Sequence, residues 1–142
     1  MEDKEIFFEQ YKLFVKTAEK VSDRRQSSNK YFLTLNSFLL GLTGYLSSIA
    51  VQLWHIVIVF TAILICLLWL LILKSFRGLN SGKFKIIHKL EEKLPTKLFK
   101  DEWDYLKHGK NSAVYLKLSV IEQGVPIVFM MLYIIVIILM LI

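Results

Sequence analysis

The stretch LWHIVIVFTAILICLLWLLIL, residues 53–73, decides the fold, because it carries no Asp, Glu, Lys or Arg over 21 positions. A helix of this length reaches about 31 Å, which is enough to cross the roughly 30 Å hydrocarbon layer of a bilayer. The stretch also lacks the polar stripe that a water-facing helix surface requires. It therefore predicts a transmembrane helix, with Lys74 and Arg77 following its last apolar residue.

Two more uncharged runs flank this stretch. They are YFLTLNSFLLGLTGYLSSI, residues 31–49, and VPIVFMMLYIIVIILMLI, residues 125–142. Only residues 50–52 separate the first two runs, which predicts an antiparallel hairpin with a tight turn. Pro126 is expected in the first helical turn of the last run, where an amide has no intrahelical partner. The three runs together predict an all-α integral membrane protein with three transmembrane helices.

The composition agrees with a membrane protein and limits the chain to a single domain. Of its 142 residues 55% are hydrophobic, against about 45–50% in soluble domains, and no second catalytic domain fits in this length. The lone cysteine, Cys66, excludes an intramolecular disulfide and is expected to pack as a small apolar residue. Basic loops beside the apolar runs explain the net charge of +6, and no zinc-finger spacing or RNP-like motif supports a nucleic-acid partner.

The basic residues predict the orientation. All eighteen lie in two segments, seven within residues 1–30 and eleven within residues 74–124. Positively charged loops are retained on the cytoplasmic side of a membrane. The N-terminal segment and the 74–124 loop are therefore expected in the cytosol, and the C-terminus outside.

The N-terminal segment, residues 1–30, carries an apolar stripe on a charged helix. Its members recur at steps of three and four and are Phe7, Tyr11, Phe14, Ala18 and Val21. The stripe needs a partner: a neighbouring subunit, helices of the 74–124 loop, or the lipid interface. Helix packing is favoured over lipid because acidic residues are mixed with the basic ones. No Gly or Pro interrupts residues 2–40, so this helix can continue into the first apolar run.

The 74–124 loop predicts a small layer of amphipathic helices. Apolar positions Phe84 to Leu94 indicate one helix that ends before Pro95. Acidic residues from Asp101 onward suit the first turn of another helix, which is expected from about Lys100 to a stop at Gly109. A further pattern covers residues 111–124 and leads into the last apolar run.

One face of the first apolar run is made of small residues. Ser37, Gly41, Gly44 and Ser48 follow one another at steps of four, three and four. Such a face allows close helix–helix contact, which is the preferred interpretation. The alternative is that it lines a central pore, and the two interpretations overlap if this helix forms the inner ring of an oligomer.

Polar residues near the expected helix ends form a candidate juxtamembrane cluster. Its members are Arg24, Arg25, Asn80, Glu91 and Glu122. The alternative is ordinary solvated charge, because exposed pairs contribute little.

The sequence offers no catalytic or metal chemistry. No apolar run contains the buried charge expected of an ion-coupled carrier, and His55, His88 and His108 have no ligand-like spacing. No Gly-rich phosphate loop or nucleophile elbow is present. We expect neither an enzyme nor a bound metal or cofactor.

A series of short motifs resembles a known family. In chain order these are SDRRQ at 22–26, FLTLN at 32–36, RGLNSGKF at 77–84, LEEKLP at 90–95, EW at 102–103, and IE at 121–122 followed by Pro126. The series is similar to the RipA-like family of small bacterial inner-membrane proteins, which is described as octameric. The resemblance implies three-span subunits that form a homo-oligomer in a bacterial cytoplasmic membrane, and it implies no reaction.

The function expected from these observations is a homo-oligomeric membrane scaffold or pore-like assembly whose partners are further copies of the chain and the lipid bilayer. Its loop helices would form a cytosolic collar, where a cytosolic protein partner would bind. The alternatives are a membrane effector subunit of a bacterial signalling or defence system and an accessory subunit of a larger membrane complex.

Overall fold

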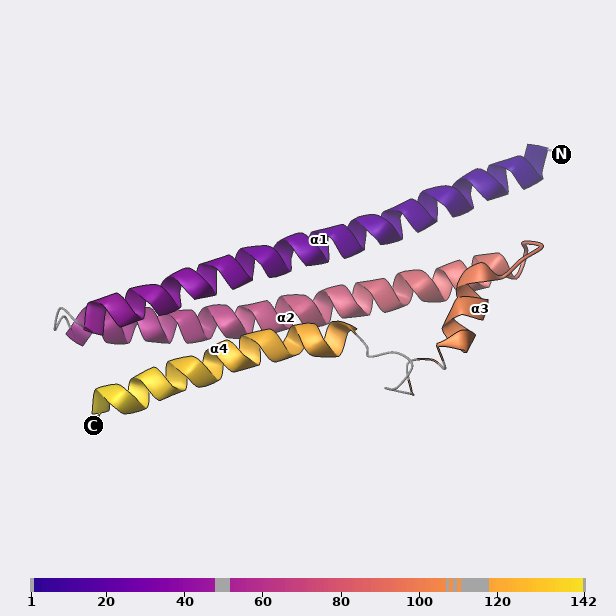
Figure 1. The fold of residues 1–142 in the computed structure, drawn as a ribbon. Coiled ribbons are helices and arrows are strands. Elements are labelled where there is room, and N and C mark those ends of the chain that lie inside the picture. The colour runs from indigo at the N-terminus through magenta and orange to yellow at the C-terminus, as the bar shows by residue number, and fades with distance from the viewer. Residues whose placement is uncertain (1, 48–51, 107, 109, 111–117, 142) are drawn as a thin grey trace. The chain divides into compact units, whose positions relative to one another are not determined.

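The computed structural model describes residues 2–47, 52–106, 108, 110 and 118–141, and its elements are all helices. They are α1 (Glu2–Ser47), α2 (Gln52–Glu91), α3 (Leu98–Tyr105) and α4 (Leu118–Leu141), shown in Figure 1. The prediction of an all-α chain is confirmed. Two of these helices, α2 and α4, contain a segment long and apolar enough to cross a membrane. Residues 48–51, which include the predicted hairpin turn, lie outside the described residues.

The chain divides into two compact units. The polar unit comprises Met1–Arg25 and Ser75–Ser119, and the apolar unit comprises Gln26–Lys74 and Val120–Ile142. Each unit takes one part of α1 and one part of α2. The polar unit also contains α3, and the apolar unit contains most of α4.

Helix α1 runs without a break for 46 residues, which confirms that the N-terminal helix continues into the first apolar run. Helix α2 is unbroken for 40 residues, so the helices predicted separately at 53–73 and from Phe84 are one helix. Gly78 and Gly82 lie inside it, each at a cost of about 1 kcal/mol relative to alanine. The helix ends at Glu91, where the amides of Lys93 and Leu94 form turn hydrogen bonds ahead of Pro95.

Helix α4 begins at Leu118, so Pro126 is its ninth residue. The expectation that Pro126 occupies the first turn is therefore wrong. Proline lacks the amide hydrogen that would bond four residues back, which disfavours it in a helix interior by about 3 kcal/mol. Helices that pack among other helices in a membrane tolerate such a proline, and Pro126 is fully buried. Helix α3 begins at Leu98, two residues before the expected start, and residues 111–117 of the next predicted pattern lie outside the described residues.

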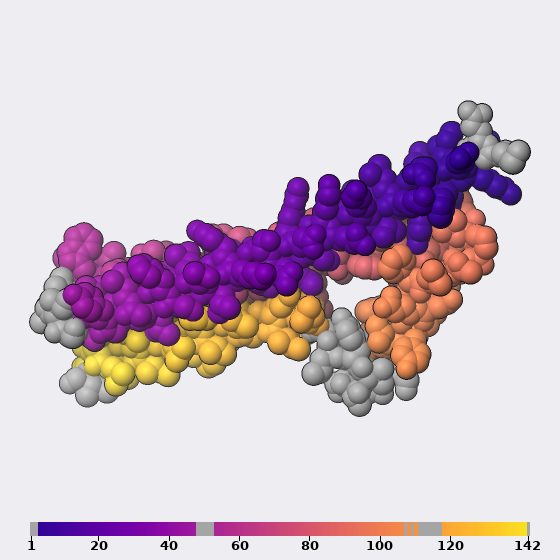
Figure 2. Space-filling view, turned by 45° about the horizontal axis from the view of Figure 1, so that its top comes forward, coloured from indigo at the N-terminus to yellow at the C-terminus, as the bar shows by residue number. Residues whose placement is uncertain are grey.

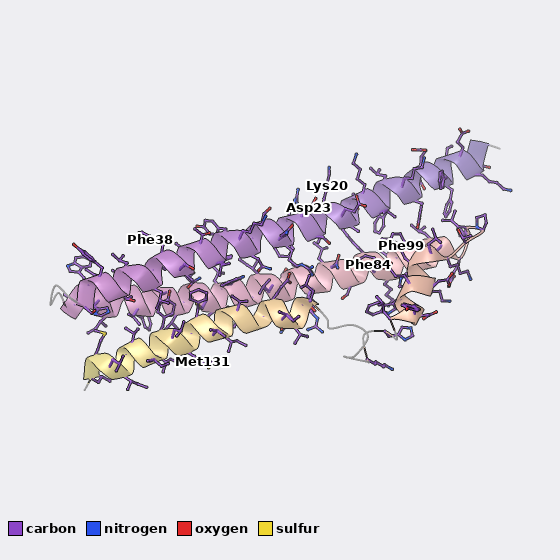
Figure 3. All side chains as sticks on the ribbon, viewed as in Figure 1. Lys20, Asp23, Phe38, Phe84, Phe99 and Met131 are labelled. Atoms are coloured by element: carbon purple, nitrogen blue, oxygen red, sulfur yellow. The ribbon has the colours of Figure 1, made fainter. Side chains whose placement is uncertain are left out.

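The core of the apolar unit is one face of α2. Its buried residues recur at steps of three and four and are Val59, Ala62, Cys66, Trp69 and Leu73. The Trp69 ring stacks on Phe32 of α1, with centroids 5.7 Å apart, and lies 6.4 Å from the Phe129 ring of α4. In Figure 2 the C-terminal part of α1 lies along α4. The outer sides carry exposed apolar residues, among them Phe38 and Met131 (Figure 3).

Candidate functional site

Glu91 links three helices of the polar unit. It is the last residue of α2 and is 1% exposed. Its Oε1 accepts hydrogen bonds from the Tyr11 hydroxyl at 3.2 Å and from the Phe99 amide at 3.0 Å, and its Oε2 accepts one from the Lys100 amide at 3.1 Å. The two amides belong to the first turn of α3, where no intrahelical acceptor exists. Glu91 therefore caps α3 from another helix, and its negative charge lies at the favourable end of the α3 dipole.

The environment of Tyr11 keeps its hydroxyl protonated. Burial, then the charge of Glu91 and the hydrogen bond to it, raise the pKa of Tyr11 from 10.0 to about 12. A neutral phenol is the form that donates to a carboxylate. Tyr11 is thus a hydrogen-bond donor throughout the physiological pH range.

The apolar stripe of the N-terminal segment lies against other residues of the polar unit. Ala18 and Val21 are buried, and the remaining three members are half-buried. Lys83 Nζ lies 4.7 Å from the centroid of the Phe14 ring and donates to Thr17 Oγ1 at 2.9 Å. Lys93 Nζ lies 5.7 Å from the centroid of another stripe residue, Phe7. Of the three partners considered for the stripe, the 74–124 segment of the same chain is the one that these contacts place against it.

The members of the candidate juxtamembrane cluster lie on three helices, α1, α2 and α4. Asn80 precedes Glu91 by eleven residues on α2, which is about 16 Å along the helix axis, and Glu91 already holds the partners described above. Arg24 is exposed, and Glu122 is half-buried in α4 of the apolar unit. Two members, Arg25 and Asn80, line the same groove in the polar unit.

The small-residue face of α1 points away from the rest of the apolar unit. Ser37, Gly41 and Gly44 are exposed, and a methyl group added at either glycine would meet no heavy atom within 4 Å. Ser48 lies outside the described residues. The buried side of α1 carries Phe32, Asn36 and Thr43 instead. The helix contacts within one chain therefore leave the small-residue face open.

Asn36 holds the three helices of the apolar unit together, a role that sequence reasoning missed. Its side chain is 0% exposed, and its Oδ1 accepts from Cys66 Sγ of α2 at 3.1 Å. The Tyr133 hydroxyl of α4 donates to the Asn36 carbonyl oxygen at 2.9 Å. The Asn36 Nδ2 donates to the carbonyl oxygen of Phe32 at 2.9 Å, so both ends of the amide are used. The available signal was an amide side chain in an uncharged run, because such a group requires partners in lipid.

A second polar contact joins α1 and α2 in the apolar unit: Trp69 Nε1 donates to Asn29 Oδ1 at 2.9 Å. Within the described part of the chain, no group of three His, Cys, Asp or Glu is placed to hold a metal ion. The expectation of no metal stays a prediction.

In the described part of the chain all elements are helices, two of them are apolar enough to cross a bilayer, and Asn36 joins both to α1 by buried hydrogen bonds. This combination is typical of the class of helical membrane proteins. Residues 8–142 match the model of the octameric membrane protein family (8xMP), and the chain belongs to that family. No curated protein and no solved structure matches the chain. The family name supports self-association in a membrane, and the RipA-like designation stays an expectation.

Proposed function

We propose that this chain forms a homo-octamer in a bacterial cytoplasmic membrane and acts there as a scaffold or pore-like assembly. Each subunit would cross the membrane three times, with α1 contributing residues 31–49 as the first span. The distribution of basic residues supports a cytosolic N-terminus and a cytosolic 74–124 segment. The family name supports the octamer.

The observation that carries this proposal is the open small-residue face of α1. Helices in lipid associate through close packing, because the surrounding hydrocarbon is as apolar as their side chains. Gly41 and Gly44 leave room for another backbone to approach, and nothing in the described part of the same chain occupies that room. A helix from a neighbouring subunit fits the requirement, so this face would form the contacts between subunits.

The first span is supported by the packing of α1 inside the apolar unit. Phe32 and Asn36 are buried against the apolar parts of α2 and α4, which are the two candidate membrane segments. A helix that forms hydrogen bonds with both segments at Asn36 would lie in the same part of the membrane as they do. Three spans per subunit follow from this reading.

The test is the mass of the purified protein in detergent for Gly41→Leu and Gly44→Leu. We expect both variants to fall from an octamer to smaller species, because a leucine side chain keeps the neighbouring backbone away. Gly82→Leu is the matched control, since it fills an equally open position in the polar unit. An octamer that survives both substitutions would end the proposal for this face.

Conductance in planar bilayers separates the two forms of the proposal. A pore-like assembly gives discrete currents, because polar and apolar linings can form a conducting path. An octamer that passes no current is a scaffold.

A further inference from the structure

The polar unit contains a groove at which parts of α1, α2 and α3 meet. Its volume is about 590 Å³, within the range of roughly 300–1,000 Å³ that is typical of small-molecule sites. Every lining residue belongs to the polar unit, so the groove is a feature of that unit alone. None of the chemistry described above uses it.

The charges that line the groove favour an anion. Arg77 and Lys85 supply two positive charges, and Glu102 is the single carboxylate among the lining residues. A guanidinium group presents a planar fork of donors that matches phosphate oxygens, and a lysine adds a compact charge. Phosphate is the anion that this set of donors recognises best.

Asn80 adds a requirement for a donor on the ligand. Its Oδ1 is buried and has no hydrogen-bond partner among the residues that the structure describes. A buried acceptor is costly to leave unsatisfied, and a hydroxyl group on a bound molecule would satisfy it. The ligand that fits both features is a phosphate ester of a polyol.

Aromatic rings form the apolar part of the lining. Phe84 of α2 meets Phe99 of α3 edge-on, with ring centroids 5.9 Å apart (Figure 3), and Trp103 of α3 is half-buried beside them. Such rings accommodate an acyl chain or a flat heterocycle. The lining therefore accepts a phosphate carried on an apolar or aromatic body.

We propose that this groove binds a polyol phosphate ester, supplied either by the headgroup of an acidic phospholipid or by a soluble molecule such as a nucleotide. Arg77 is three residues beyond Lys74, where the uncharged run of α2 ends. In the orientation of the proposed function, on which the lipid source rests, Arg77 lies at the level of the headgroups. His88, at the other end of the lining, is eleven residues and about 16 Å further along α2, where a soluble ligand has access.

The experiment uses the full-length protein and has two arms. In the soluble arm, AMP and glycerol 1-phosphate are titrated into the protein in detergent and binding is measured by calorimetry. In the lipid arm, the protein is placed in nanodiscs of phosphatidylglycerol or of phosphatidylcholine, and native mass spectrometry counts the lipids retained. Phosphatidylcholine is the control lipid, because its headgroup has no net charge and no hydroxyl.

Arg77→Gln and Lys85→Gln should each weaken binding by about tenfold, the usual effect of losing one charge-assisted hydrogen bond. Lys89→Gln is the matched control, since Lys89 is an exposed cation of α2 outside the groove. Groove-dependent binding in the soluble arm, or selective retention of phosphatidylglycerol in the lipid arm, supports the proposal and identifies the source.

Two results would overturn it: no binding in either arm, or an equal loss in Lys89→Gln. The mass of each sample is measured in parallel. An octamer that binds no ligand rejects only the proposed binding site in the groove. A wild-type protein whose mass is not that of an octamer rejects the proposed function.

Discussion

The two units join their helices in a similar arrangement but with different chemical groups. In each unit a single buried residue accepts hydrogen bonds from two other helices: Asn36 in the apolar unit and Glu91 in the polar unit. The apolar unit uses a neutral amide, a thiol and a phenol. The polar unit uses a carboxylate, the amides that begin α3 and the phenol of Tyr11.

The proposed membrane arrangement, in which hydrocarbon surrounds the apolar unit, accounts for the difference. A charged group in hydrocarbon is costly, so an asparagine that uses both ends of its amide is a suitable junction there. A carboxylate is tolerated in the polar unit because three donors and a helix dipole compensate its burial. The charged junction should therefore be the more sensitive one to substitution.

The largest effect is expected for Glu91→Ala. It leaves the amides of Phe99 and Lys100 and the Tyr11 hydroxyl without their acceptor, at a total of about 3 kcal/mol. Amide hydrogen exchange should show loss of protection at the start of α3. Glu92→Ala is the control, because Glu92 is exposed and adjacent. Equal exchange in both variants would show that Glu91 does not cap α3.

A smaller effect is expected for Asn36→Leu. The substitution removes the side-chain acceptor of Cys66 and places a larger apolar group in a filled core, for a cost of about 1–2 kcal/mol. The measurement is the apparent unfolding temperature in detergent. Thr61→Val is the control, since the Thr61 hydroxyl donates only to the Val57 carbonyl oxygen of its own helix. A loss for Asn36→Leu as large as that for Glu91→Ala would remove the contrast between the units.

Tyr133→Phe tests the junction of the apolar unit by removing a single oxygen atom. It removes the donor to the Asn36 carbonyl oxygen and leaves the ring packing in place, at about 1 kcal/mol. The double variant with Asn36→Leu should lose less than the two single variants added together, because the Tyr133 hydroxyl also lies 3.4 Å from Asn36 Oδ1. Strict additivity of the unfolding temperatures would contradict the network.

The last effect concerns pH and the polar unit alone. The pKa of Tyr11 is raised from 10.0 to about 12 in the folded chain, so the folded state holds this proton more tightly than the unfolded state. The resulting stability is complete below pH 10 and is lost as pH rises to about 12. Unfolding temperatures of wild-type protein and Tyr11→Phe should converge across that window. A constant difference would exclude a titrating Tyr11.

The helical class and the continuity of α1 could be predicted, because uncharged length and the absence of Gly and Pro are properties of the sequence itself. The end of α2 could not be predicted in this way. The change of composition at Lys74 indicates where hydrocarbon ends, but backbone hydrogen bonds continue through it to Glu91. Pro126 was misplaced for a related reason, since the helix that contains it begins eight residues earlier.

The junctions escaped prediction because each depends on tertiary register. Glu91 was grouped with Arg24 and Arg25 by charge and expected depth, whereas its partners are amides that reach it only after the chain turns at Pro95. Asn36 was visible as an amide in an uncharged run. Choosing Cys66 and Tyr133 as its partners required knowing which faces of α2 and α4 meet α1.

Because α1 is unbroken, the direction in which each side chain points around the helix axis matters as much as the length of the helix. Its buried residues in the apolar unit, Phe32, Asn36 and Thr43, fall on one side of the helix. Phe32 and Thr43 are about three full turns apart. Deleting one residue between Phe32 and Asn36 would rotate the two by about 100° relative to each other, so that Phe32 and Asn36 could not both keep their contacts with α2. Insertions of seven or eleven residues nearly preserve the phase, and lengths in between do not.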